Sequence, residues 1–274
     1  MSCSTRFQRV VAGIQKLYPI AYADGAWDNT GLLVDASGVN KNDKFHILLT
    51  VDLTQSVVEE AVRARSSLVL AYHPFIFRGL KSITPKDPQQ ASLIKLIHHG
   101  VSVYCPHTAV DAAKGGVNDW LAEAVANVDT KTVIEKNPDV EDVGMGRLLT
   151  LSSPASLDEL IPAIKSHLGI NHLQVATNKS HSEKTISTVA LCAGSGGSVF
   201  RGVKADLYLT GELSHHEALY FKETDSSVIV CNHSNTERGF LKVLKQQLLT
   251  QFQSTDPEIV IDISTTDKDP FQTF

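Results

Sequence analysis

Short runs of β-branched and other apolar residues alternate with helical segments along most of this chain. The runs span residues 45–51, 67–72, 101–106, 205–210 and 228–232. Continuous apolar runs of this length are typical of strands that are buried on both faces of a sheet. Because the segments between them have a helical period, the connections are expected to be crossovers between parallel strands. The pattern predicts an α/β protein with largely parallel sheets.

A polar stretch divides this pattern into two halves. Residues 129–146 contain Pro138 and several acidic side chains and have poor periodicity, which predicts a hinge. We expect two similar α/β lobes, an N-terminal one over 1–128 and a C-terminal one over 147–274. Ligands of open α/β sheets bind at the carboxyl ends of strands, so we expect a metal site at these ends, between the lobes. Helices are expected at 54–65, 89–99, 117–128, 156–168, 214–222 and 236–252.

The first 23 residues have two interpretations. They contain Arg6, Arg9 and Lys16 and no acidic residue, as mitochondrial transit peptides do. They also place apolar residues on one helical face, which is typical of a helix that faces a core. We favour the structural helix and a cytoplasmic protein, with a mitochondrial location as the alternative. The residues on that face are Phe7, Val10, Val11, Ile14 and Leu17.

The composition excludes several classes of function. A formal net charge of -5 over 274 residues argues against a dominant nucleic-acid surface. No apolar run approaches the roughly 18 residues that a membrane span requires, so no membrane association is expected. Cys105, Cys192 and Cys231 lie in predicted strands without C-x-x-C spacing, which predicts buried free thiols in a reducing compartment.

Potential metal ligands follow the predicted strands. His73 and His233 each follow an apolar run, and Asp111 and Glu237 lie four residues beyond His107 and His233. Imidazole nitrogens with carboxylate oxygens suit zinc, iron or manganese. A bridging carboxylate would also allow two ions about 3.5 Å apart, so one or two divalent ions per chain are expected.

Each of these residues also has a structural interpretation. His73 could only end a strand, Asp111 could be a turn residue, and Ser234-x-x-Glu237 fits a helix capping box. The occurrence of all four at strand ends favours the metal site.

Two further polar segments have open interpretations. Residues 211–217 could be an exposed helix start, with Ser214 as the N-cap, or could place Glu212 and His215 beside the metal as acid–base groups. His215 or His216 could also be a ligand. The glycine-rich segment 194–197 could hold an anion through backbone N–H groups, although most such segments are ordinary turns. Residues 28–31 are interpreted first as a turn.

Five motifs occur in an order that resembles one known family over the whole chain. It is the NGG-interacting-factor-three family, also known as the GTP cyclohydrolase 1 type 2-like family, in its compact form without an inserted domain. The motifs are Trp27-Asp28-Asn29-x-Gly31-Leu32-Leu33, Tyr72-His73-Pro74-x-x-Phe77, His107-Thr108-x-x-Asp111, Thr210-Gly211-Glu212-x-Ser214-His215-His216 and His233-x-x-Thr236-Glu237-Arg238-Gly239.

The resemblance implies a two-lobed α/β fold, a paired divalent-metal site and a ring-shaped homohexamer whose metal sites face an internal cavity. By motif, the metal ligands correspond to His73, Asp111, His233 and Glu237, with His107 as a neighbour. Many members carry two consecutive histidines before the proline, and Tyr72 replaces the first of them here. Its phenol, with an ordinary pKa of about 10, is a poorer ligand at neutral pH.

Two functions are compatible with these features. One is a metal-dependent hydrolase of a nucleotide-like or cyclic-amide substrate, with Glu212 or His215 moving protons, as the cyclohydrolase label of the family implies. The other is a non-catalytic, metal-binding oligomeric scaffold that acts through metal handling or through a protein partner linked to transcriptional coactivation. The acidic balance disfavours the passage of nucleic acid through a ring.

Overall fold

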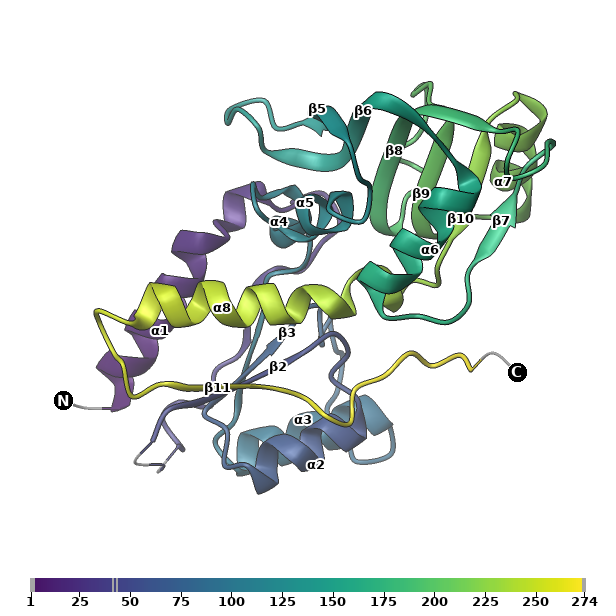
Figure 1. Ribbon diagram of the computed structural model, residues 1–274. Helices are drawn as coiled ribbons and strands as arrows, with labels where there is room; N and C mark the ends of the chain where they lie inside the picture. Colours follow the sequence, from purple (N-terminus) through teal and green to yellow (C-terminus); the bar gives the residue numbers. More distant parts are fainter. Residues whose placement is uncertain (1–2, 41, 43, 273–274) are drawn as a thin grey trace. The chain divides into compact units, whose positions relative to one another are not determined.

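The computed structural model describes residues 3–40, 42 and 44–272. The chain divides into two compact units, and each contains one sheet (Figure 1). Unit 1 consists of Met1–Val110 and Leu241–Lys268, and unit 2 consists of Asp111–Phe240 and Asp269–Phe274. In the described part of the chain, no helix has the length and apolarity needed to cross a bilayer.

The sheet of unit 1 has five strands in the order β1-β4-β3-β2-β11. Strands β4, β3, β2 and β11 are parallel, and β1 pairs with β4 in the antiparallel direction. All residues of β2, β3 and β4 are buried, as their continuous apolar sequences predict. The bounds are β1 Gly31–Val34, β2 His46–Thr50, β3 Leu68–Ala71, β4 Ser102–Cys105 and β11 Val260–Ile263.

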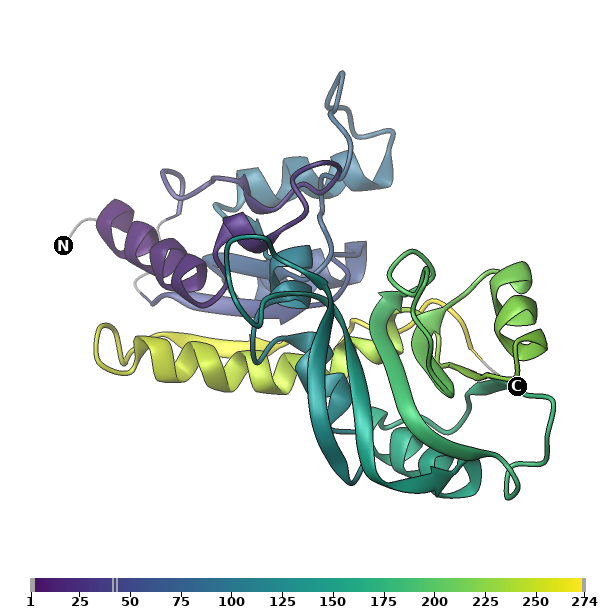
Figure 2. The ribbon, with the colours of Figure 1, turned by 90° about the horizontal axis from the view of Figure 1, so that it is seen from above.

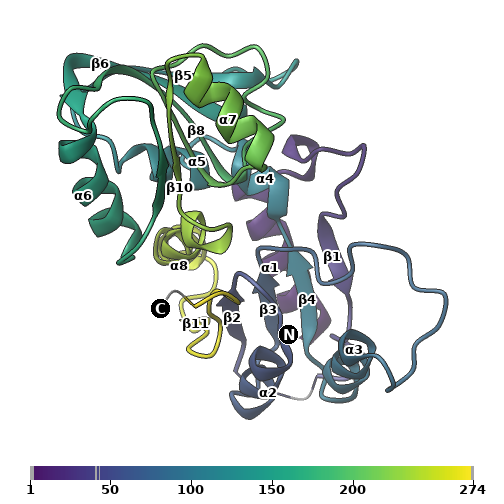
Figure 3. The ribbon, with the colours of Figure 1, turned by 90° about the vertical axis from the view of Figure 1, so that its right-hand side faces the viewer.

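Helices cover both faces of this sheet (Figure 3). The apolar sides of α2 and α3 form one buried cluster with β2, β3 and β4, which includes Val57, Leu96 and Val103. Helices α1 and α8 pack against each other so closely that a side chain at Gly13 would lie 2.4 Å from the ring of Phe252. The bounds are α1 Cys3–Leu17, α2 Gln55–Arg63, α3 Pro88–His98 and α8 Leu241–Phe252.

Unit 2 has a six-stranded sheet in the order β5-β6-β8-β9-β10-β7. Strands β8, β9 and β10 are parallel, and the other pairings are antiparallel. Figure 2 shows the long curved strands β6 (teal) and β8 (green) side by side. The strands are β5 Val128–Lys136, β6 Gly144–Ser156, β7 Gln174–Ala176, β8 Thr185–Ser195, β9 Leu207–Glu212 and β10 Ser227–Val230.

Four helices complete this part of the chain. The boundary between the units falls inside α4 (His107–Ala112), and α5 (Val117–Ala122) follows. Helices α6 (Leu157–Leu168) and α7 (His215–Glu223) each begin with a capping box. The serine hydroxyl accepts the N–H of the glutamate three residues on, and that glutamate accepts the serine N–H, as both sequences predict.

The predicted α/β class with two sheets is confirmed, and so is the first helix. Phe7, Val10 and Ile14 are buried on α1, while residues 1–2 lie outside the described part. The three cysteines expected in strands are buried and free.

Residues 129–146, expected to be a hinge, form an antiparallel hairpin of β5 and β6 in unit 2. Their polarity has a different cause, because β5 is an edge strand with mostly exposed side chains. The chain also passes from unit 1 to unit 2 between residues 110 and 111, and returns to unit 1 between residues 240 and 241. Both crossings lie inside the expected lobes rather than between them. The predicted helices 117–128 and 236–252 are shorter than expected, since α5 ends at Ala122 and α8 begins at Leu241.

Candidate functional site

In unit 1, polar side chains follow the carboxyl ends of three adjacent parallel strands. Asp52 comes after β2, His73 after β3 and His107 after β4. The Nδ1 atom of His73 lies 2.9 Å from Oδ1 of Asp52, and its backbone N–H donates to the carbonyl of Val51. A hydrogen bond through Nδ1 orients the imidazole and leaves Nε2 as the nitrogen for an external ligand. Asp52 is therefore a positioning residue that the sequence pattern did not identify.

His107 is held by a second carboxylate. Its Nδ1 lies 2.7 Å from Oδ1 of Asp28, whose side chain is 1% exposed and also accepts hydrogen bonds from Thr30 and Thr108. Burial alone would raise the pKa of Asp28, but the hydrogen bonds from His107 and Thr108 lower it by more than burial raises it. The pKa of this carboxyl therefore lies well below its usual range. Residues 28–31, interpreted first as a turn, lead into β1, and Asp28 among them organises this end of the sheet.

The backbone at His107 is also unusual. Its φ of 27° lies in the left-handed region, which non-glycine residues adopt rarely and at an energetic cost. Such strain persists where the surrounding contacts define the conformation, and the bond to Asp28 is one of them.

Aromatic rings surround the two histidines of unit 1. The ring of Tyr72, a buried residue, lies edge-on to His73 at 5.1 Å and to His107 at 5.9 Å, measured between centroids. Trp27 lies edge-on to His107 on the other side, at 5.7 Å, and contacts Phe77. Tyr72 thus packs beside the two imidazole groups. It occupies the position where many members of the family that this chain resembles carry the first of two consecutive histidines.

In unit 2, the candidate donors His233 and Glu237 follow β10, and Glu212 is the last residue of β9. Nε2 of His233 is 3.3 Å from Oε1 of Glu237, and its Nδ1 is 2.9 Å from Oε1 of Glu212. Two donors on one ion, each about 2.1 Å from it, are themselves roughly 3–3.4 Å apart. The His233–Glu237 pair therefore has a separation suited to a shared cation, and Glu212 orients the imidazole from its other nitrogen. This pair could hold a metal ion.

The side chain of Glu237 does not cap the N-terminus of a helix. It lies between two short 3-10 turns, Ser234–Thr236 and Arg238–Phe240, and is 3% exposed. The hydroxyl of Ser234 donates to Asp269 and accepts from Arg238. The capping-box interpretation is therefore wrong, because the hydroxyl of Ser234 is used by other groups.

The end of β8 fits closely against this pair. Gly194 has a φ of 64°, and a Cβ atom there would lie 2.8 Å from Oε1 of Glu237 and 2.9 Å from Nε2 of His233. Its N–H donates to the hydroxyl of Thr236 at 2.8 Å. Glycine at 194 is thus required by the donor pair, and its N–H group is already used within the protein.

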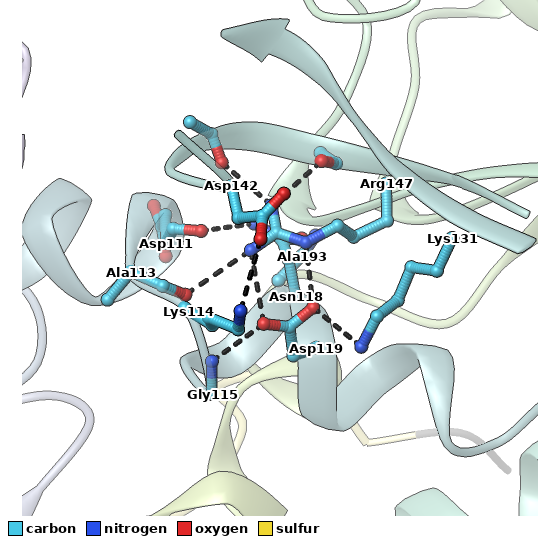
Figure 4. A network of polar contacts seen from close by, with 12 residues as sticks. Asp111, Ala113, Lys114, Gly115, Asn118, Asp119, Lys131, Asp142, Arg147 and Ala193 are labelled. Carbon is cyan, nitrogen blue, oxygen red and sulfur yellow. Dashed lines mark hydrogen bonds and ion pairs between the residues drawn. The ribbon is translucent and has the colours of Figure 1, made fainter. Parts of the chain in front are cut away.

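Asp111 lies on α4 and is 8% exposed. The amide of Asn118 connects this segment to β8, because it donates to the carbonyl of Asp111 and accepts the N–H of Ala193 (Figure 4). Burial, followed by the charges of Asp111, Glu135 and Glu237, raises the pKa of the Cys192 thiol. Asp111 and Glu237 therefore both contribute negative charge near the end of β8.

A buried ion pair supports the same segment (Figure 4). The guanidinium of Arg147, which is 2% exposed, contacts both carboxylate oxygens of Asp119, at 2.8 and 3.3 Å. It also donates to the carbonyl groups of Gly144, Gly146 and Ala113. Sequence reasoning missed this network, although a charged residue at the start of an apolar strand was a signal for it.

The two residues expected to catalyse lie in different surroundings. Glu212 ends β9 and is bonded to His233, so it contacts a candidate ligand directly. His215 is exposed in the first turn of α7, directly after the N-cap Ser214. Its ring lies edge-on to that of His216, with 5.4 Å between the ring centroids. The structure thus brings Glu212, His233 and Glu237 together in unit 2, and His73, Asp52 and His107 in unit 1.

Known proteins resemble this chain along its whole length. A relative from Saccharomyces cerevisiae named NGG1-interacting factor 3 is 45% identical, covering 97% of this chain and 96% of its own. Protein NIF3 homolog of Schizosaccharomyces pombe is also 45% identical and covers 98% of both chains.

Solved structures share the fold. A Bacillus cereus protein related to NIF3 superposes with a TM-score of 0.84 at 18% identity, covering 97% of this chain and 98% of its own. The model of the family described as Duf34/NIF3 (NGG1p interacting factor 3) matches residues 5–270. This chain therefore belongs to the Duf34/NIF3 family.

Proposed function

We propose that the protein binds a divalent metal ion and uses it to hydrolyse a nucleotide-like or cyclic-amide substrate. The observation that carries the proposal is the His233–Glu237 donor pair, 3.3 Å apart, with Glu212 behind the imidazole. His73 and Asp111 complete the proposed ligand set. Zinc, iron and manganese suit these donors, and we propose one or two ions per chain.

The groups behind the ligands support this proposal. His73 is oriented by Asp52 and His233 by Glu212, each through Nδ1. A carboxylate behind a histidine is a common arrangement in metal sites, where it fixes the ring and increases its basicity. Gly194 provides the space in which the donor pair lies.

The hydrolytic role follows from the chemistry that such an ion supplies. A bound divalent ion polarises a carbonyl or phosphoryl oxygen and lowers the pKa of water towards neutrality. Glu212 holds the imidazole of His233 in place, and we assign to it the acceptance of a proton from the attacking water. His215, exposed at the start of α7, is the proposed donor to the leaving group.

A second function competes with hydrolysis. The yeast relative is named as a factor that interacts with NGG1, which supports a role for this protein as a metal-binding scaffold with a protein partner. We also propose that it assembles into a homohexameric ring, which light scattering of the purified protein would test. The three buried thiols fit the cytoplasmic, reducing location that we propose.

Metal content per chain is the test of the site. Gently purified wild type is compared with Asp111→Asn and Glu237→Gln by elemental mass spectrometry. Asp158→Asn and Glu223→Gln are the matched controls, since both carboxylates are exposed. We expect metal in the wild type and the controls and its loss from both site variants. Equal metal content in all five proteins would refute the ligand assignment.

The number of ions separates the two functions. Two ions per chain would support the hydrolase, whereas one would favour the scaffold. Tyr72→His restores the first of the family's two consecutive histidines and is expected to increase the metal content. Metal-replete protein that turns over no member of a nucleotide panel would exclude the hydrolase and leave the scaffold.

A further inference from the structure

Unit 2 contains a cavity of about 470 Å³ that none of the four proposed metal donors lines. One wall follows β8 and consists of Gly197, Phe200, Arg201, Gly202, Val203 and Lys204. The other wall is the side of α7 formed by His216, Glu217, Tyr220 and Phe221. This volume lies within the range of small-molecule sites in proteins, about 300–1,000 Å³.

The floor of the cavity is aromatic. Phe200 and Phe221 line the cavity and are buried, and the buried ring of Tyr208 packs against both, with centroid distances of 3.9 Å to Phe221 and 5.2 Å to Phe200. Tyr220 stands at the rim with 65% of its surface exposed, 5.7 Å from the ring of Phe221. A rigid aromatic floor with one exposed ring favours a flat, apolar ligand group.

The rim of the cavity carries positive charge. Arg201 and Lys204 are exposed, and within the described residues neither side chain forms an ion pair or a hydrogen bond. His216 adds a third basic group. The one acidic residue, Glu217, is bound to the N–H and hydroxyl of Ser214 at 2.9 and 2.7 Å. Arg201 also interacts electrostatically with Glu217, but the side chains of Arg201 and Lys204 are not hydrogen-bonded within the described residues, so both cations can contact an anionic ligand.

Close packing holds this arrangement together. A Cβ atom at Gly197 would lie 2.4 Å from Oε1 of Glu217, and one at Gly196 would lie 2.7 Å from the ring of Phe200. The two glycines thus let the turn after β8 approach both α7 and the aromatic floor. The glycine-rich segment serves here as the wall of a cavity.

We propose that this cavity binds a small molecule in which a planar aromatic ring carries a phosphate group. The ring would stack against Tyr220 over the aromatic floor. The phosphate would meet Arg201 and Lys204, because a guanidinium binds phosphate in a bidentate manner and an ammonium adds a point charge. A purely apolar ligand would leave both cations unused.

Calorimetric titration with adenosine 5′-monophosphate, adenosine and inorganic phosphate tests the proposal. The variants are Arg201→Gln/Lys204→Gln and Tyr220→Ala, all at exposed positions. The matched control is Arg78→Gln/Lys81→Gln, which removes two exposed cations from unit 1. We expect the nucleotide to bind more tightly than either fragment.

The variants should separate the two halves of the ligand. The cation variant is expected to weaken the nucleotide about 10-fold and leave adenosine unchanged, and Tyr220→Ala to weaken both. The control should bind as the wild type does. Absence of nucleotide binding up to about 1 mM, or equal binding by all variants, would overturn the proposal.

The outcome is independent of the proposed metal site. The titrations are repeated after metal removal with a chelator, and binding is expected to persist because no proposed ligand lines the cavity. Loss of nucleotide binding on chelation, with recovery on reloading the metal, would place the ligand at the metal and overturn the assignment to this cavity.

Discussion

Replacement of Arg147 by methionine is expected to destabilise unit 2 strongly. Methionine keeps an apolar stem of similar length but removes all the hydrogen bonds of the guanidinium. These go to both oxygens of Asp119 and to the carbonyl groups of Gly144, Gly146 and Ala113, at 2.7 to 3.3 Å. Because Arg147 is 2% exposed, water cannot replace these bonds without opening the structure.

The size of the destabilisation depends on the partners that Asp119 keeps in the variant. Removal of one partner of a buried ion pair typically costs about 3–5 kcal/mol. Asp119 keeps the ammonium of Lys131 at 2.9 Å and the N–H of Gly115 at 2.7 Å, so the lower part of this range applies. We expect the free energy of unfolding to fall by about 3 kcal/mol, which is a large fraction of the stability of an ordinary domain.

The two tryptophans of the chain provide the assay. Trp120 is 7% exposed in unit 2, whereas Trp27 is 52% exposed in unit 1. In a Trp27→Phe background, urea unfolding followed by fluorescence therefore reports on unit 2. The control is Arg201→Met, which removes an exposed arginine of unit 2 and should change the free energy by less than about 0.5 kcal/mol. A loss below about 1 kcal/mol for Arg147→Met would refute the reasoning.

Three further changes test other features. Burial raises the pKa of Asp119, but Arg147 and its other partners lower it from 3.8 to about 2. The stabilisation, roughly 2 kcal/mol, is thus complete above pH 3.8 and lost as the pH falls towards 2, and acid unfolding should show this loss in wild type but not in Asp119→Asn. Gly194→Ala should reduce metal content while far-UV circular dichroism stays native, since its Cβ would enter the donor pair; unchanged metal content would contradict this. Ser156→Ala should cost about 1 kcal/mol in urea unfolding by removing the cap of α6, and Ser153→Ala, at an exposed position, should cost almost nothing.

The sequence predicted the elements whose signals are local. The strands buried on both faces have continuous apolar runs, and both capping boxes lie within four residues of chain. Strands β1 and β11 were missed because their placement depends on pairing with strands far along the chain, whereas β5 was missed although its partner β6 follows it directly. β5 is polar since it forms an exposed edge, and β11 pairs with β2 from the far end of the chain.

The candidate site was predicted in a similar, partial way. Histidines at strand ends are visible in one sequence, but the carboxylates that orient them are not. Asp28 binds His107 from 79 residues away, and Asp52 binds His73 from 21 residues away. Only the neighbouring positions of β2, β3 and β4 in the sheet explain the second of these pairings.

The return of the chain to unit 1 has a consequence for synthesis on the ribosome. Strand β2 forms parallel pairs with β11, beginning at His46 and Val260. Roughly 200 residues must be added between them, which takes about 10–40 s at ordinary translation rates. During this interval one side of β2 has no native partner and offers its N–H and C=O groups to other chains. The edge of β2 therefore stays open to misassembly until β11 has been synthesised and pairs with it.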